Sequence, residues 1–211
     1  ALGAAGSGRN GFVASYTAEG NLRWSQDFTG MGSDTVIDLA RTEDGSVYAI
    51  VQHSSDLTVG GSLYPGGGVV AIKMALQDLD ADAPEVLWSV RLTTNATGRG
   101  GRLGVHGASG AVAAIVNDPP APGFFNGDAA ILGLNPADGE ITWRLEVPQA
   151  GGNTLTLNEV SVSSTGEVYA IGDFQGALVT VPRGPNMEAM PGVVLNNEGG
   201  IDGLVLKLDS T

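Results

Sequence analysis

Three kinds of segment recur in the same order along this chain, and this repetition constrains the fold more than any other feature of the sequence. The first kind ends in tryptophan and occupies residues 20–24, 84–88 and 139–143. The second kind occupies residues 45–50, 110–115 and 166–171. The third kind precedes each tryptophan, at residues 11–16, 69–73 and 128–132, and recurs at residues 202–207. Ordered repetition of this kind is the signature of a repeat architecture.

Each recurring segment has the pattern of a β-strand. Val47 and Ala49 alternate with Tyr48 and Ile50, and β-branched and aromatic residues of this kind favour strands. Both alternating sets are apolar, as expected for a sheet packed between two neighbours. The turns between segments end in glycine, and Asp-Gly pairs between apolar runs favour tight hairpins. No segment has a convincing helix pattern, and residues 74–82 have the composition of only a short helical turn.

Together the segments predict a four-stranded antiparallel unit. A first strand, at residues 35–41, 103–107 or 157–163, precedes the second kind of segment, then the third kind, then the tryptophan strand. The units are expected at residues 1–30, 31–93, 94–148 and 149–211, with the first and last of them partial. Four-stranded antiparallel sheets repeated in series are typical of β-propellers. The expected fold is therefore all-β, with about three propeller-type blades and a partial one in a single propeller, or part of one, over residues 1–211.

The ends of the repeat predict an incomplete ring. About three blades are fewer than the four that closed propellers usually need. The sequence starts and finishes on the third kind of strand, so its two ends duplicate a strand and do not complement each other. An open stack of sheets exposes strand edges, which natural proteins avoid. We expect the chain to be part of a longer propeller, or to be completed by another subunit.

The motifs resemble a known repeat family. Residues 202–209 read Asp-Gly-Leu-Val-Leu-Lys-Leu-Asp, and residues 166–172 read Gly-Glu-Val-Tyr-Ala-Ile-Gly. With residues 11–24 they look like the bacterial seven-bladed β-propeller (SBBP-type) repeat family, over nearly the whole chain. Residues 138–143 also share an Asp-Gly-x-x-x-Trp turn with propeller repeats of the pyrroloquinoline-quinone type. Departures from the pattern lie at residues 67–68, 77–84 and 117–125. The resemblance implies a propeller and a secreted, periplasmic or cell-surface location in a bacterium.

Composition excludes several classes of partner and site. The 211 residues carry a formal net charge of −13 with only 10 Lys and Arg residues, which argues against nucleic acid and anionic membrane surfaces. The chain has no cysteine, so disulfides and thiolate sites are excluded. No apolar run approaches the roughly 20 residues that span a bilayer. Residues 1–8 do not have the pattern of a signal peptide, so, if the protein is exported, its signal is expected outside this sequence.

Candidate sites are few. Asp78, Asp80 and Asp82 place three carboxylates at alternate positions. They indicate either a calcium site or a solvated acidic turn, and Ala83 does not fit the glycine of an EF-hand loop. Phe124 and Phe125 lie among prolines and form either an exposed contact for a partner or an anchor that folds back onto the protein.

The repeated aromatic residues are interpreted as structural. Packing between neighbouring repeats explains their recurrence better than stacking on a ligand does. These residues are Trp24, Trp88, Trp143, Tyr48 and Tyr169. The only histidines, His53 and His106, are isolated in the sequence. Ordinary packing or surface roles are expected for them, although a Ser-His-Asp arrangement assembled in space stays open.

Three hypotheses for function follow. The first is a non-enzymatic, extracytoplasmic binding or assembly module with a protein partner or self-association, without cofactor or with calcium. The second is a propeller enzyme, either a hydrolase or lyase or a quinone-dependent dehydrogenase, whose site lies partly outside this sequence. The third is a structural subunit of a filament or surface assembly, because head-to-tail contacts that do not close produce fibres.

Overall fold

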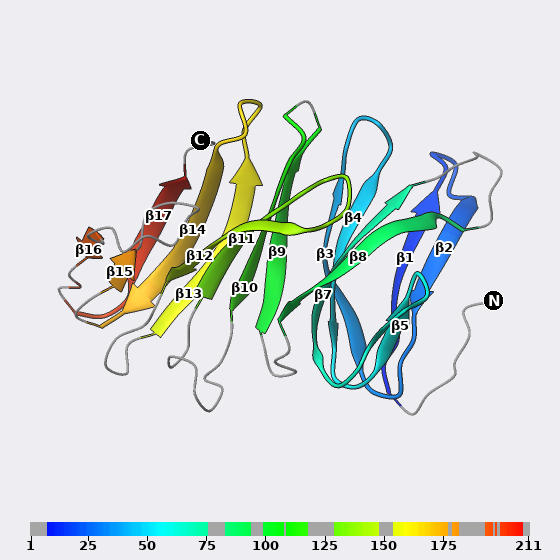
Figure 1. Ribbon diagram of the computed structural model, residues 1–211, viewed down its shortest axis with the longest axis horizontal. Helices are drawn as coiled ribbons and strands as arrows, with labels where there is room; N and C mark the ends of the chain where they lie inside the picture. Colours follow the sequence, from blue (N-terminus) through cyan, green and yellow to red (C-terminus); the bar gives the residue numbers. More distant parts are fainter. Residues whose placement is uncertain are drawn as a thin grey trace. The chain divides into compact units, whose positions relative to one another are not determined.

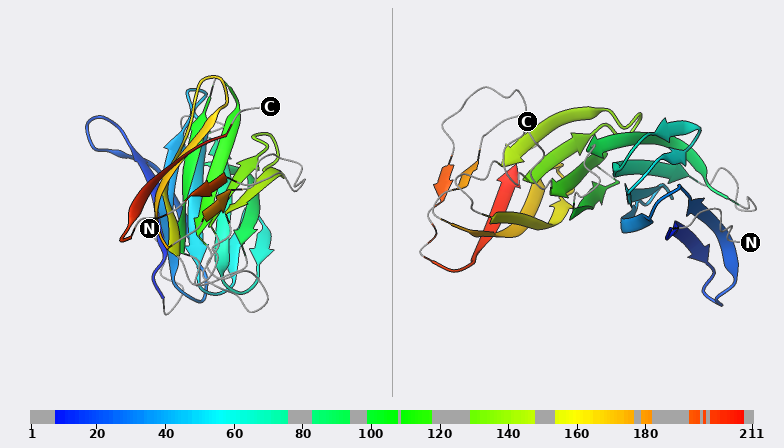
Figure 2. Two further views of the ribbon diagram at one scale, coloured as in Figure 1. Left: turned by 90° about the vertical axis from the view of Figure 1, so that its left-hand side faces the viewer. Right: turned by 90° about the horizontal axis from the view of Figure 1, so that it is seen from below.

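The protein is built from β-strands. The computed structural model describes residues 8–75, 83–93, 99–107, 109–117, 129–147, 154–176, 179–181, 193–195, 197 and 199–208. Strands are the only regular elements among these residues, in every view of Figure 1 and Figure 2. The prediction of an all-β chain is confirmed. The chain divides into two compact units, Ala1–Thr97 and Gly98–Thr211.

The first unit contains a two-stranded and a four-stranded sheet. Sheet I pairs β1 (Gly11–Tyr16) with β2 (Leu22–Phe28). Sheet II has the order β3-β4-β7-β8 and consists of β3 (Asp34–Arg41), β4 (Val47–His53), β7 (Gly68–Ala75) and β8 (Glu85–Thr93). A small hairpin, β5 (Leu57–Val59) with β6 (Ser62–Tyr64), lies between β4 and β7 in the chain.

The second unit contains a four-stranded and a three-stranded sheet. Sheet III has the order β12-β11-β10-β9 and consists of β9 (Arg99–His106), β10 (Ala111–Asn117), β11 (Ala129–Leu134) and β12 (Ile141–Val147). Sheet IV has the order β13-β14-β17 and consists of β13 (Thr154–Val162), β14 (Val168–Gln175) and β17 (Asp202–Leu208). A second small hairpin joins β15 (Val179–Val181) to β16 (Val193–Leu195).

Sheets II and III have the strand order that the sequence predicts. All their neighbouring strands are antiparallel and follow the chain order. The two small hairpins were not predicted, and both follow the second strand of their sheet. The first of them has a sequence signal, because Gly60 and Gly61 form a two-residue turn with positive φ between short apolar runs. None of the described sheets closes on itself.

The hairpins between first and second strands share one turn geometry. In sheet II, the amide of Gly45 donates to the carbonyl of Thr42 and the amide of Thr42 to the carbonyl of Ser46, both at 3.0 Å. In sheet IV, Gly166 and Ser163 repeat these two bonds at 3.0 and 2.9 Å. Gly45 and Gly166 have φ of 88° and 86°, a left-handed conformation that glycine adopts without steric cost.

The tryptophan strands also share one register. Trp24 pairs with Ser15, Trp88 with Lys73 and Trp143 with Gly133. Each tryptophan strand has a bulge next to this pair. The residue immediately before the tryptophan has no partner on the third strand in any of the three sheets. This shared register lets positions be matched between sheets.

Each unit has a core between its two sheets. In the first unit, Val13, Trp24 and Phe28 of sheet I pack with residues from alternate positions of β4 and β7, including Ala49 and Ile72. In the second unit, the core residues of sheet III include Ile115 and Ile131. They share one cluster with residues of sheet IV such as Ala170, Leu204 and Leu206. Sheet-on-sheet packing of alternate side chains is therefore the common element of both units.

Candidate interaction surface

A tyrosine and a lysine form a pair across two strands of sheet IV. Tyr169 of β14 lies directly opposite Lys207 of β17. The Lys207 ammonium lies 6.0 Å from the centre of the Tyr169 ring, a cation–π contact. Because side chains alternate along a strand, this pair lies on the opposite face from Ala170 and Leu206, which belong to the core with sheet III.

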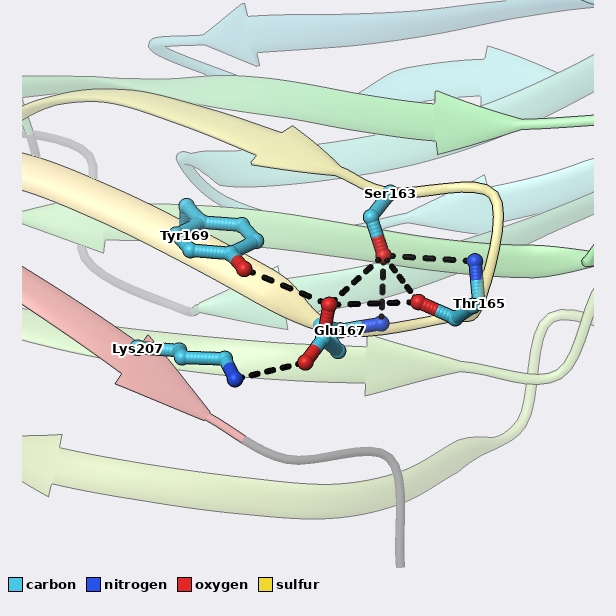
Figure 3. A network of polar contacts seen from close by, with 5 residues as sticks. All are labelled: Ser163, Thr165, Glu167, Tyr169 and Lys207. Carbon is cyan, nitrogen blue, oxygen red and sulfur yellow. Dashed lines mark hydrogen bonds and ion pairs between the residues drawn. The ribbon is translucent and has the colours of Figure 1, made fainter.

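Glu167 joins this pair to the turn before β14 (Figure 3). Its carboxylate contacts Lys207 Nζ at 2.6 Å and accepts hydrogen bonds from the hydroxyls of Tyr169 at 3.2 Å and Thr165 at 3.1 Å. The hydrogen bond from Lys207, followed by that from Thr165, lowers the pKa of Glu167. Ser163 closes the turn, because its hydroxyl oxygen accepts a hydrogen bond from the amide of Glu167 at 3.1 Å. The network holds the lysine and the tyrosine in place on this face.

Sheet II contains a matching set. Tyr48 lies opposite Lys73, and the lysine ammonium is 5.4 Å from the centre of the tyrosine ring. Asp44 of the turn accepts hydrogen bonds from the Thr42 hydroxyl and the Ser46 amide. These two bonds, with a smaller contribution from the charge of Lys73, lower the pKa of Asp44. Trp88 of the fourth strand meets the Tyr48 ring edge-on, at 5.8 Å between centroids and 65° between planes.

The two matching sets differ in exposure. Tyr48 and Ile50 are 3% and 0% exposed, whereas Tyr169 and Ile171, at the matching positions of sheet IV, are 36% and 48% exposed. Val205, which pairs with Ile171, is 73% exposed. We call Tyr169, Ile171 and Val205 the sheet IV surface. The corresponding apolar face of sheet III, with Ala113 and Ile115 at the positions of Tyr169 and Ile171, is buried in the core with sheet IV.

Among the described residues, sheet IV also has an edge strand without a further neighbour. In sheets II and III the third strand is flanked by a tryptophan-bearing fourth strand. Within the described residues, β17 pairs only with β14. Among the described residues, this edge of β17 is adjacent to the exposed face, and an apolar face beside an edge strand is a usual feature of an interaction surface.

The structure places the repeated tryptophans in three separate settings. Trp24 is buried in the core between sheets I and II. Trp88 is buried beside Tyr48. Trp143 packs against the core between sheets III and IV and lies over Gly133, where an added Cβ would be 2.0 Å from the indole nitrogen. No two of these rings form an aromatic contact with each other among the described residues.

The remaining predicted site residues lie outside the described residues. These are Phe124 and Phe125, predicted as a contact, and Asp78, Asp80 and Asp82, predicted as calcium ligands. Within the part of the chain that the structure describes, no group of three or more acidic or histidine side chains is placed to hold a metal ion. The calcium site stays a prediction.

A buried polar pair in sheet II was not predicted from the sequence. Asp34, the first residue of β3, lies opposite His53, the last residue of β4, and the two are 1% and 0% exposed. His53 Nδ1 is 2.6 Å from the carbonyl oxygen of Ser55. Among the described residues, His53 Nε2 and both carboxylate oxygens of Asp34 have no hydrogen bond of acceptable geometry. Burial raises the pKa of Asp34, and the Gly30 amide and the charge of His53 oppose this in part.

Other acidic and histidine residues have local roles. The Asp38 carboxylate accepts a hydrogen bond from the amide of Leu39 at 2.8 Å. His106 Nδ1 accepts the Ser109 amide at 3.4 Å in the turn between β9 and β10. His53 and His106 belong to different units of the chain.

The fold and this surface define an all-β protein of small antiparallel sheets that pack face to face within each unit. No protein-family model matches the chain, and no curated protein is similar to it in sequence. Among the described residues there is no helix with the length and apolar character needed to cross a membrane.

Proposed function

We propose that this protein is a non-enzymatic binding or assembly module made of propeller-type blades, and that the sheet IV surface is where it contacts its partner. One observation carries the proposal. Tyr169, Ile171 and Val205 are exposed, although the matching residues of sheets II and III are buried. Covering these side chains removes apolar surface from water, which is the main driving force for association.

The ion-paired network next to the surface suits such a role. Lys207 and Glu167 fix the position of Tyr169 before any partner binds, so less side-chain freedom is lost on binding. Tyrosine is also among the residues enriched at the centres of interfaces. The extracytoplasmic, bacterial location belongs to the proposal as well, and rests on the resemblance to exported propeller repeats.

The test measures the size of the native species in an extract of the source organism, by size-exclusion chromatography with immunodetection. We expect the wild-type protein to elute in a species larger than one chain. The double variant Ile171→Glu/Val205→Glu should elute as a single chain, because two buried carboxylates without partners oppose association. The control Met31→Glu/Leu63→Glu changes two exposed apolar residues elsewhere and should behave like the wild type.

Two results would contradict the proposal. One is a wild-type protein that elutes as a single chain in the extract. The other is a large species that persists in the Ile171→Glu/Val205→Glu variant, which would place the contact elsewhere. The enzyme hypothesis remains the alternative, and a turnover activity abolished by one side-chain change would favour it.

A further inference from the structure

A second exposed apolar face lies on sheet I. Phe12, Tyr16 and Leu22 are 52%, 58% and 56% exposed. Tyr16 and Leu22 pair across the strands, and Phe12 alternates with Val13, which is buried against sheet II. Phe12, Tyr16 and Leu22 therefore lie on the face of sheet I that is turned away from sheet II. We call these three residues the sheet I surface.

When the sheets are matched by register, the sheet I surface and the sheet IV surface correspond to opposite faces of a sheet. The shared register matches Ser15 of β1 with Lys207 of β17. Ser15 and Lys73 each pair with a tryptophan. Lys207 corresponds to Lys73, because both lie opposite the tyrosine of the second strand. Counting back three residues matches Phe12 with Leu204, a core residue that packs toward sheet III. On the other side, Ile171 and Val205 match Ile115 and Ile131, residues of sheet III that belong to the same core cluster as Leu204.

The core of the second unit is therefore a template for contact between the two surfaces. There, Ile115 and Ile131 on one sheet share a hydrophobic cluster with Leu204 and Leu206 on the next. By the same matching, Ile171 and Val205 are suited to pack with Phe12 and Ala14. We infer that the partner of the sheet IV surface is the sheet I surface of a second copy of this chain, joined head to tail. This inference rests on the proposed function, for which it names the partner.

A head-to-tail contact of this kind uses two different surfaces of each copy. After the first contact, one copy keeps its sheet I surface free and the other keeps its sheet IV surface free, so association continues to a ring or an open filament. It follows that blocking either surface stops growth, while two chains blocked on different surfaces can still form one contact. This property separates the inference from a symmetric dimer, in which one surface contacts itself.

The test uses purified chains of residues 1–211 in sedimentation velocity. The first variant, Phe12→Glu/Leu22→Glu, blocks the sheet I surface, and the second, Ile171→Glu/Val205→Glu, blocks the sheet IV surface. We expect the wild type to exceed the 21.4 kDa mass of one chain increasingly with concentration. Each variant alone should stay at the mass of one chain. Their equimolar mixture should form a species of two chains and no larger one. The control Met31→Glu/Leu63→Glu should associate as the wild type does.

Three outcomes would overturn the inference: a wild type that stays monomeric, a variant that still associates alone, or a mixture that does not form the two-chain species. A purified chain that stays monomeric, although the native extract contains a large species dependent on Ile171 and Val205, would overturn only the inference. The proposed function would then stand with another protein as the partner.

A second measurement does not depend on the glutamate variants folding. Because the chain has no cysteine, Phe12→Cys and Val205→Cys each introduce a single thiol. We expect mild oxidation of an equimolar mixture to give the mixed disulfide in clear excess over the proportion that random pairing gives. A statistical distribution, or an excess of either homodimer, would contradict a head-to-tail contact. Val205→Cys paired with Leu63→Cys serves as the matched control and should give no such excess.

Discussion

At one position of the third strands, the side chain varies together with the side chain of the neighbouring second strand. The residue opposite the tryptophan is Ser15, Lys73 or Gly133, and the matching residue of β17 is Lys207. The lysines lie over a tyrosine ring. Where the tyrosine is replaced by Ala113, the lysine is replaced by glycine and the ring of Trp143 fills the space. The two substitutions therefore compensate for each other in volume.

This packing predicts that Gly133→Ala destabilises the protein. An added Cβ would lie 2.0 Å from Trp143 Nε1, so the indole ring must move out of its site. Overpacking of this kind costs about 1–3 kcal/mol, to be measured as the change in the free energy of unfolding in urea. Gly203→Ala is the matched control, because nothing lies within 4 Å of the added Cβ. Equal stability of the two variants would show that the ring of Trp143 is free to move.

The buried pair Asp34 and His53 replaces an apolar pair. By register, the matching residues of sheet IV are Leu155 and Phe174, which are opposite each other and both buried in the core. Sheet II therefore buries two ionisable groups where sheet IV buries two apolar side chains. A buried carboxylate without hydrogen bonds opposes folding in its charged form. Asp34 thus makes the stability of the first unit depend on pH.

We expect Asp34→Asn to gain stability relative to the wild type as pH rises. Burial raises the folded-state pKa of Asp34 above the value of about 3.9 in the unfolded chain. The favourable contribution of protonated Asp34 is therefore complete below that unfolded value and is lost as pH rises through the folded value. Asparagine does not titrate, so the difference in unfolding free energy between the two proteins should grow over this range.

Urea titrations at a series of pH values measure this difference. Glu43→Gln removes the same charge from an exposed position and should show no comparable growth. A difference that is constant with pH, or that changes in the opposite direction, would mean that the opposing contributions from Gly30 and His53 outweigh the cost of burial.

At the scale of strands, the sequence predicts what depends on local pattern. Alternation of apolar residues and glycine-ended turns locate the strands of sheets II and III, because both signals act within a few residues. The hairpin of β15 and β16 has no such signal, since its two strands are three residues each and far apart in the chain. Asp34 and His53 were missed because nothing local shows that two polar residues nineteen positions apart share a buried site.

The candidate surface was predicted only in part. Recurrence of the second kind of segment identified Tyr169 but assigned it the same structural role as Tyr48. The difference between them arises from what covers each face, which depends on tertiary structure. Glu167 and Lys207 were not singled out, because their contact joins a turn to a strand about forty residues later.

One amide side chain links two sheets of the second unit. The side-chain amide of Asn117 in β10 donates a hydrogen bond to the carbonyl of Leu157 and accepts one from the backbone amide of Leu157, both at 3.0 Å. Leu157 lies in β13, which pairs only with β14 among the described residues. The Asn117 side chain therefore supplies hydrogen-bond partners for backbone groups at the β13 edge of sheet IV and links sheet IV to sheet III.

We expect Asn117→Ala to destabilise the protein by about 1–3 kcal/mol, since it leaves two half-buried backbone groups of Leu157 without partners. Unfolding in urea measures the loss. Asn158→Ala is the control, because Asn158 is exposed and makes one long bond of 3.4 Å to Asp173. A loss no greater than that of the control would mean that water replaces the amide without cost.

At the scale of the whole molecule, charge and apolar surface act against each other. Each chain carries a formal net charge of −13, so two copies repel at low ionic strength. The sheet I and sheet IV surfaces contribute six large apolar or aromatic side chains to the proposed contact. Their burial is favourable at any ionic strength. Whether copies associate then depends on how far salt screens the repulsion.

This balance predicts that association strengthens with salt. The screening length is about 10 Å at 0.1 M and about 3 Å at 1 M, so raising NaCl across this range removes most of the repulsion and leaves the apolar contact. Sedimentation velocity of the wild type should therefore show a dissociation constant that falls as salt rises. A contact held by ion pairs would weaken instead, and that result would direct the search for the interface away from Ile171 and Val205 and toward the charged residues around them.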